Sequence, residues 1–144
     1  MLVQQILNAK PDNSVHTIAP DRAVAEAAVM LTNHKIGAVV VSSNGQTALG
    51  ILSERDIVRG IAMQGAGCLA ASVETLMTAQ IVTCTRHETS DAILSKMTQG
   101  RFRHIPVLEG DQMVGLISIG DVVKAQLSTL AMEKEALEGM IRGF

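Results

Sequence analysis

Two serine–aspartate pairs, each with the spacing Ser-x-x-Asp, are the residues of this chain whose types and spacing best suit ligand binding. Ser53 and Asp56 follow a glycine and two aliphatic residues, and Ser118 and Asp121 follow the same lead. An ionised carboxylate can accept hydrogen bonds from two neighbouring hydroxyls, such as those of a ribose. Each pair also precedes a predicted helix, whose free N–H groups favour an anion. The pattern therefore predicts a polar site that is written twice.

The same spacing has a purely structural interpretation. A serine at the N-cap and an acid three residues later form a capping box, which satisfies the first backbone N–H groups of a helix. Capping alone would explain Ser53 with Asp56, and Ser118 with Asp121. Aspartate rather than glutamate in both copies favours a ligand role, and serine can serve both purposes.

The signature belongs to a repeat that covers most of the chain. Thr17 aligns with Thr83 at an offset of 66 residues, and Asp56 aligns with Asp121 at an offset of 65. The difference falls beside a Ser-Ser-Asn-Gly turn signal, where an insertion is tolerated. Each copy has the pattern strand, helix, strand, strand, helix. The predicted strands span residues 15–18, 36–41 and 48–52 in the first copy, and 81–84, 105–108 and 113–117 in the second.

Composition limits the classes of function. The chain has 144 residues, of which 47% are hydrophobic, so it can form an aliphatic core. A net charge of −2 and an aromatic content of 1% argue against nucleic-acid binding, which uses basic surfaces and stacking rings. No apolar run reaches the length of a membrane span, and the N-terminus does not resemble a signal peptide. We therefore expect a cytoplasmic protein.

Cysteine and histidine usage argues against a disulfide framework or a metal site. Cys84 lies in an apolar run and is expected in the core, whereas Cys68 lies in a Gly/Ala-rich linker and is expected at the surface. The four histidines show no paired metal-ligand spacing, so no metal is expected. No nucleophile motif or phosphate-binding glycine loop occurs, so an enzyme is not expected.

The motifs together resemble a known family. They are KIGAVVV and GILSERDIVRGIA in the first copy, RFRHIPVLEGDQMVGLISIGDVVKAQL in the second, and the pair Met77–Thr78. The chain resembles a tandem pair of CBS domains, named after cystathionine β-synthase, of the stand-alone bacterial kind. This implies an α/β (α+β) fold of two pseudo-symmetric β-α-β-β-α repeats packed as one module. The repeats would span residues 1–66 and 67–127, followed by a helical tail at 128–144.

The resemblance also implies a function. Such modules commonly bind an adenosyl ligand (AMP, ADP, ATP, NAD or S-adenosylmethionine derivatives) in one or both of two clefts, and often form disc-shaped dimers. We therefore expect a non-catalytic sensor that transmits its ligand state to an unidentified protein partner. The alternatives are a ligand-free interaction module and, less favoured, a nucleic-acid binder that uses the basic residues at 101–104.

The family resemblance assigns candidate ligand contacts. Asp56 and Asp121 would bind ribose, and Ser53 and Ser118 would reach a ribose or phosphate oxygen. The remaining candidates near the base and the sugar are Thr17, Thr83, Ile36, Gly37, Ala38, Ile105 and Pro106. Ile36, Ala38 and Ile105 would sandwich the adenine, and Gly37 would let the backbone approach the ring.

Phosphate recognition is expected to distinguish the copies. Arg103 and His104 in the second copy are the first candidates, helped by Arg55 or Lys35 across the cleft. A solvated basic loop is the alternative. Related members have the order His-Arg, so the reversed order here leaves open which of the two residues reaches phosphate. If only one cleft binds tightly, we expect it to be the cleft of Asp121.

The C-terminal segment exceeds the repeat. Its apolar residues follow a helical pattern from about residue 128 to residue 142. Packing onto its own domain and contact with a partner are both open interpretations of this helix.

Overall fold

The computed structural model describes residues 1–143. Its elements are α1 (Val3–Ala9), β1 (Thr17–Ile18), α2 (Val24–His34), β2 (Ala38–Val41), β3 (Gly50–Ser53), α3 (Glu54–Gln64), the 3-10 helix η1 (Ala66–Ala70), α4 (Val73–Leu76), α5 (Ser90–Gly100), β4 (His104–Glu109), β5 (Gln112–Ser118) and α6 (Ile119–Ile141).

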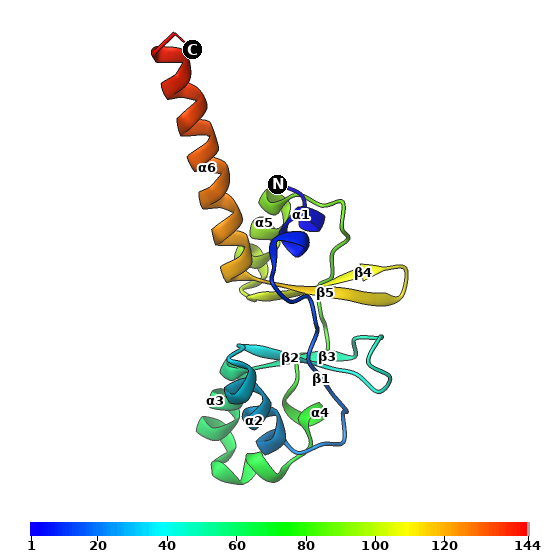
Figure 1. The fold of residues 1–144 in the computed structure, drawn as a ribbon. Helices are drawn as coiled ribbons and strands as arrows, with labels where there is room; N and C mark the ends of the chain where they lie inside the picture. The colour runs from blue at the N-terminus through cyan, green and yellow to red at the C-terminus, as the bar shows by residue number, and fades with distance from the viewer. Residues whose placement is uncertain (144) are drawn as a thin grey trace.

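Two small sheets face each other in the middle of the molecule, and the helices lie outside them (Figure 1). In one half, β2 pairs parallel to β1 and antiparallel to β3, and α2, α3 and α4 pack on this sheet. In the other half, β4 pairs antiparallel to β5, beside α1, α5 and α6. This arrangement confirms the predicted fold of two pseudo-symmetric α/β repeats.

The short helix near the start of each repeat packs into the core of the other repeat. Val3, Ile6 and Leu7 of α1 join the core formed by α5, β4, β5 and α6. Val73 of α4 joins the core of α2, β2, β3 and α3 instead. The Val3 N–H donates to the Glu88 carbonyl at 2.9 Å, which fixes α1 beside the second repeat. Neither half therefore has a complete core without the segment that leads the other.

The glycine of each repeated signature makes room for these exchanged segments. A Cβ on Gly115 would lie 2.8 Å from Leu7 Cδ2, and a Cβ on Gly50 would lie 2.6 Å from Met77 Sδ. Contacts this short do not occur between real side chains. Close packing, not backbone conformation, thus favours glycine at both positions, most strongly at Gly50, where a Cβ would also lie 2.8 Å from the Thr78 carbonyl oxygen.

The strand predicted at residues 81–84 is wrong except for one residue. Only Cys84 forms a bridge, parallel to Val107, whereas β1 in the first repeat forms a two-residue strand. In the first repeat the Val40 N–H donates to the His16 carbonyl at 3.0 Å. The residue that corresponds to Val40 is Pro106, which has no N–H to donate. Proline thus removes one bond of the ladder and shortens the strand.

Two further expectations are settled by the fold. Cys68 was expected at the surface but is buried, with 3% of its area exposed, because η1 folds back onto α3. The helix predicted near 128–142 exists as part of α6, which continues without a break from the signature of the second repeat to Ile141. Its outer half extends away from the rest of the molecule (Figure 1).

Candidate functional site

Both serine–aspartate pairs form capping boxes at the start of a helix. At α3 the Ser53 N–H donates to Asp56 Oδ2 at 2.9 Å, and at α6 the Ser118 N–H donates to Asp121 Oδ2 at 2.9 Å. Each serine hydroxyl accepts the N–H of its aspartate in return. The structural interpretation of the motif is therefore confirmed in both repeats. It leaves open whether a ligand uses the same groups.

The two carboxylates differ in their surroundings. Asp56 is buried, and its Oδ1 faces the guanidinium of Arg59 at 3.5 Å. The side chain of Asp121 is 21% exposed, and among the described residues only Lys10 and Ser118 form hydrogen bonds with its carboxylate, both at Oδ2. Within residues 1–143 the Oδ1 atom of Asp121 forms no hydrogen bond, whereas Oδ1 of Asp56 contacts Arg59.

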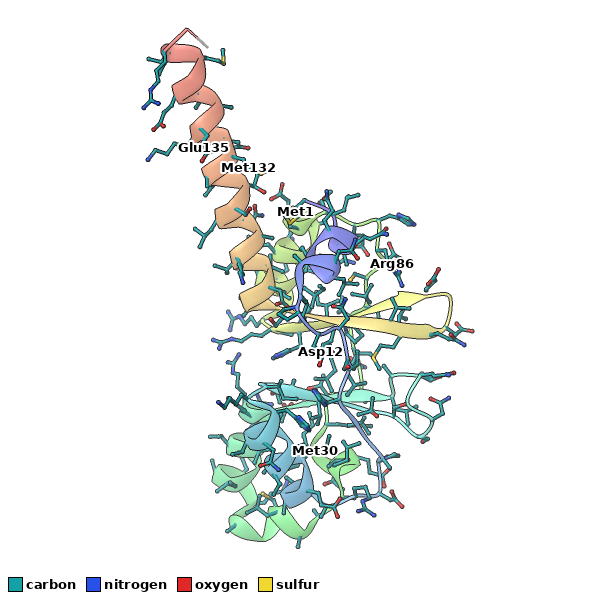
Figure 2. All side chains as sticks on the ribbon, viewed as in Figure 1. Met1, Asp12, Met30, Arg86, Met132 and Glu135 are labelled. Atoms are coloured by element: carbon teal, nitrogen blue, oxygen red, sulfur yellow. The ribbon has the colours of Figure 1, made fainter. Side chains whose placement is uncertain are left out.

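Lys10 comes from a segment that crosses between the halves. Its Nζ atom lies 3.1 Å from Asp121 Oδ2 and 3.0 Å from the Leu116 carbonyl, to which it donates. This segment links α1, which packs in one half, to β1, which pairs in the other. Figure 2 shows Asp12 on it, between the two sheets. A polar segment is therefore held where the halves meet.

A cleft of about 320 Å³ lies along this crossing segment. Its volume falls within the range of small-molecule sites. Both halves contribute to its walls, so a ligand there would contact both repeats. The lining residues are Lys10, Asp12, Asn13, Ser14, Val15, His16, His34, Ile36, Gly37, Ala38, His104, Leu116 and Ser118.

Imidazole rings supply much of the polar lining. The rings of His16 and His34 are stacked, with centroids 3.9 Å apart and an interplanar angle of 22°. On the other side, a Cβ on Gly37 would lie 3.4 Å from His104 Nε2, so the glycine backbone comes close to this ring. Burial lowers the pKa of His104, although the nearby Asp121 opposes the effect. The buried site therefore favours the neutral form of the His104 ring.

The structure brings several of the predicted contact residues together. Ile36, Gly37 and Ala38 line the cleft from the first repeat, and His104 and Ser118 line it from the second. Asp121 lies directly behind this wall through its bonds to Ser118 and Lys10. Residues from opposite halves thus share one cleft.

Other predicted residues lie elsewhere. Arg103 is exposed, and its carbonyl accepts the Ile119 N–H at 2.8 Å, while Lys35 is exposed at the end of α2. Ile105, expected beside adenine, is fully buried in the core, because it faces α1 and α5 rather than the cleft. None of the following residues lines the cleft: Ser53, Arg55, Asp56, Thr17, Thr83 and Pro106.

Sequence reasoning missed the crossing segment altogether. Lys10, Asp12, Ser14 and His16 line the cleft, yet none of them belongs to a repeated motif. Their signal was a short polar stretch between two apolar ones, which is typical of an ordinary loop. Only the packing of α1 against the second repeat shows that this loop must cross the cleft.

Residues 1–143 contain neither a cluster of metal-ligating side chains nor a membrane-spanning helix. No group of three or more His, Cys, Asp or Glu side chains is placed to hold a metal ion. No helix in this range is long and apolar enough to cross a membrane.

Comparison with known proteins gives consistent matches. The family model for the CBS domain matches residues 3–63 and again residues 73–128. A solved CBS-domain-containing protein from Agrobacterium tumefaciens is 47% identical, with a TM-score of 0.84 over 88% of this chain and 99% of that chain. The mitochondrial CBS domain-containing protein CBSX3 of Arabidopsis thaliana is 36% identical over 127 residues. That alignment covers 85% of this chain and 62% of the plant protein, so this chain spans less than two thirds of it.

Two more distant structures share the fold and contain ligands. A CBS domain protein of Pyrobaculum aerophilum, 20% identical with a TM-score of 0.75, was solved in complex with AMP. The CBS domain pair of protein MJ0100, 24% identical with a TM-score of 0.77, was solved with 5′-methylthioadenosine and S-adenosyl-L-methionine. At these identities the likeness concerns the fold alone.

Proposed function

We propose that this chain, which belongs to the CBS-domain family, is a non-catalytic sensor that binds an adenine nucleotide in the cleft beside Asp121. Distant members of the fold bind AMP or S-adenosyl-L-methionine, which supports an adenosyl ligand. The observation that supports the proposal most is Asp121, whose carboxylate is bonded through Oδ2 to two residues of the cleft wall, Ser118 and Lys10, and whose Oδ1 forms no hydrogen bond within residues 1–143.

The cleft offers one group for each part of a nucleotide. Asp121 would accept the two ribose hydroxyls, with Ser118 beside it. Ile36 and Ala38 provide the apolar contact that an adenine ring requires. The base would therefore lie against the start of β2, and the sugar would face the start of α6.

The charges of the cleft favour a phosphate over a sulfonium group. Lys10 is the one lysine or arginine in the lining, and the rings of His16, His34 and His104 offer N–H donors beside the single acidic lining residue, Asp12. A phosphate oxygen close to these groups would form charge-assisted hydrogen bonds. The sulfonium of S-adenosylmethionine would instead meet like charge. We therefore place AMP, ADP, ATP and NAD ahead of sulfonium ligands.

Ligand binding would act through the junction of the two halves. The first repeat contributes Ile36 and Gly37, the second contributes His104 and Ser118, and Lys10 comes from the segment that joins them. A ligand that contacts all three parts favours the arrangement in which its contacts are best satisfied. That arrangement would set which surface is offered to a protein partner.

Isothermal titration calorimetry on the full chain tests the proposal. The ligands are AMP, ADP, ATP, NAD, adenosine and S-adenosylmethionine. We expect binding of at least one phosphate-bearing compound, and weaker binding of adenosine and S-adenosylmethionine. A native-state ligand must also raise the melting temperature. If no compound binds and none shifts the melting temperature, the chain is a ligand-free interaction module.

The repeat supplies a matched control. Asp121→Asn and Asp56→Asn each alter one capping box, and the melting temperature of each variant measures its cost in stability separately from its effect on binding. We expect Asp121→Asn to weaken nucleotide binding at least tenfold and Asp56→Asn to change it little, since Asp56 is buried and faces Arg59. Equal losses in both variants would contradict the assignment to the Asp121 cleft.

A further inference from the structure

The outer half of α6 exposes apolar side chains that no other residue within 1–143 covers. Residues 130–137 are all exposed, and the helix extends well past the rest of the molecule (Figure 1). A helix that lacks tertiary packing over several turns is marginal in water. Contiguous exposed apolar surface of this kind marks an interaction site. The helix therefore requires a partner, and its sequence indicates which one.

The exposed side chains form a regular seam. Counting along α6, alternate steps of four and three residues connect six positions, which is the 3.5-residue period of a coiled coil. All six side chains are exposed. They are Val123, Leu127, Leu130, Lys134, Leu137 and Ile141.

The seam does not coincide with the face that α6 packs on its own repeat. Val122 and Ala125 are buried against the body, with 0% and 6% of their area exposed. The neighbouring Val123 and Leu127 are 47% and 62% exposed. Since successive helix positions differ by about 100°, the seam lies to one side of the packed face and is accessible along its length.

We propose that α6 pairs with α6 of a second copy of this chain as an antiparallel coiled coil. This inference does not rest on the proposed nucleotide binding. An antiparallel pair of identical helices has two-fold symmetry, so each contact occurs twice and the assembly closes as a dimer. In this register Leu127 packs on the partner's Leu137, and Val123 packs on the partner's Ile141.

The charges beside the seam select the antiparallel orientation. Lys124 and Glu138 flank the seam on the same side. In the antiparallel register Lys124 meets the partner's Glu138, which gives two attractive pairs per dimer. A parallel pair would place Lys134 against the partner's Lys134, and Glu133 near the partner's Glu138. The parallel pair thus has only like-charge contacts, whereas the antiparallel pair has two Lys124–Glu138 contacts against one contact between the two Glu133 side chains at the two-fold axis.

Lys134 is the one polar residue in the seam, and the antiparallel register accommodates it. It lies opposite the partner's Leu130, where its methylene chain can cover the leucine while the ammonium group reaches water. Within its own helix the ammonium lies 3.9 Å from Glu138 Oε1. One polar position in an otherwise apolar seam is a known device for fixing register.

Sedimentation velocity on the full chain, from micromolar to sub-millimolar concentration, tests the pairing. We expect a monomer that converts to a dimer as concentration rises. Leu130→Glu combined with Leu137→Glu should abolish the dimer. Met132→Glu is the matched control, because Met132 is 58% exposed on the same helix but lies outside the seam (Figure 2). A chain that stays monomeric throughout, or a dimer that survives the double leucine change, overturns the proposal.

Two measurements test the orientation. Lys124→Glu alone and Glu138→Lys alone should each weaken the dimer, and the two changes together should restore it. A spin label on Arg142→Cys should report a separation on the order of 30 Å in the antiparallel pair, against on the order of 10 Å in a parallel one. The two native cysteines are buried, so labelling is confined to this position. A short separation, or no restoration in the double variant, overturns the antiparallel pairing.

Discussion

Lys10 and Asp121 are separated by 111 positions in the chain, yet the Lys10 Nζ atom lies 3.1 Å from Asp121 Oδ2. The contact joins the segment that crosses between the halves to the helix that carries the second signature. The side chains are 27% and 21% exposed, so the pair is neither fully solvated nor dry. Lys10 is the one lysine or arginine that lines the cleft, so it is the cation expected to contact a phosphate there.

Replacing Lys10 should weaken nucleotide binding through the loss of its charge while leaving the stability of the fold nearly unchanged. Partly exposed ion pairs contribute little to stability, so Lys10→Gln should lower the free energy of unfolding by less than about 1 kcal/mol. A lost charge-assisted hydrogen bond should weaken nucleotide binding by about tenfold. Adenosine carries no phosphate, so its affinity should change less. Calorimetry with AMP and adenosine on both proteins makes the comparison, and equal losses for the two ligands would contradict a role for Lys10 at the phosphate.

His104 should make stability depend on pH. Burial lowers its pKa in the folded state below the ordinary value of 6.5, so the unfolded chain binds the proton more readily. The stabilisation from the neutral ring is present above pH 6.5 and is lost as pH falls from there through the lowered pKa. His104→Gln should remove this part of the dependence. Urea unfolding between pH 5 and about pH 8 measures it, and an unchanged slope in the variant would contradict the assignment.

Bound phosphate should reverse this effect. An anion beside His104 favours the protonated ring, so nucleotide binding should take up protons near neutral pH. Calorimetry in two buffers of different ionisation enthalpy reports that uptake, and adenosine serves as the control without phosphate. If AMP and adenosine show the same proton uptake, the phosphate does not lie near His104.

The sequence predicted the repeat well because its signal is local. Ser53 with Asp56, and Ser118 with Asp121, mark where a strand ends and a helix begins, and the structure has capping boxes at both places. What the sequence could not reveal depends on contacts across the molecule. Leu7 lies near the start of the first repeat in sequence but packs in the core of the second, and this exchange carries Lys10 to the cleft. The shortened strand pairing at residues 81–84 could have been predicted from Pro106, because a proline within a strand removes a hydrogen-bond donor from the ladder.

Because Leu7 of α1 packs in the core of the second repeat, truncating its side chain should lower the stability of the fold. Leu7 is 3% exposed in the core of the second repeat. Leu7→Ala should lower the free energy of unfolding by about 2–5 kcal/mol, the range for large-to-small changes in a core. Leu2 is 40% exposed, so Leu2→Ala is a matched control with little expected effect. Denaturant unfolding measures both variants, and equal values would mean that α1 does not pack as described.

The signature glycines should be intolerant of even one added methyl group. In Gly50→Ala the new Cβ would lie 2.8 Å from the Thr78 carbonyl oxygen, which is backbone and bonded to the Ile51 N–H, so it cannot move aside freely. Overpacking of this kind costs about 1–3 kcal/mol. Gly115→Ala meets only the flexible end of Leu7, so it should cost less. Gly67→Ala is the control, since no atom lies within 4 Å of its Cβ position. Thermal unfolding of the three variants should therefore rank Gly50→Ala as the least stable and Gly67→Ala as the most stable. A reversed order would mean that close packing does not explain the glycine in the signature.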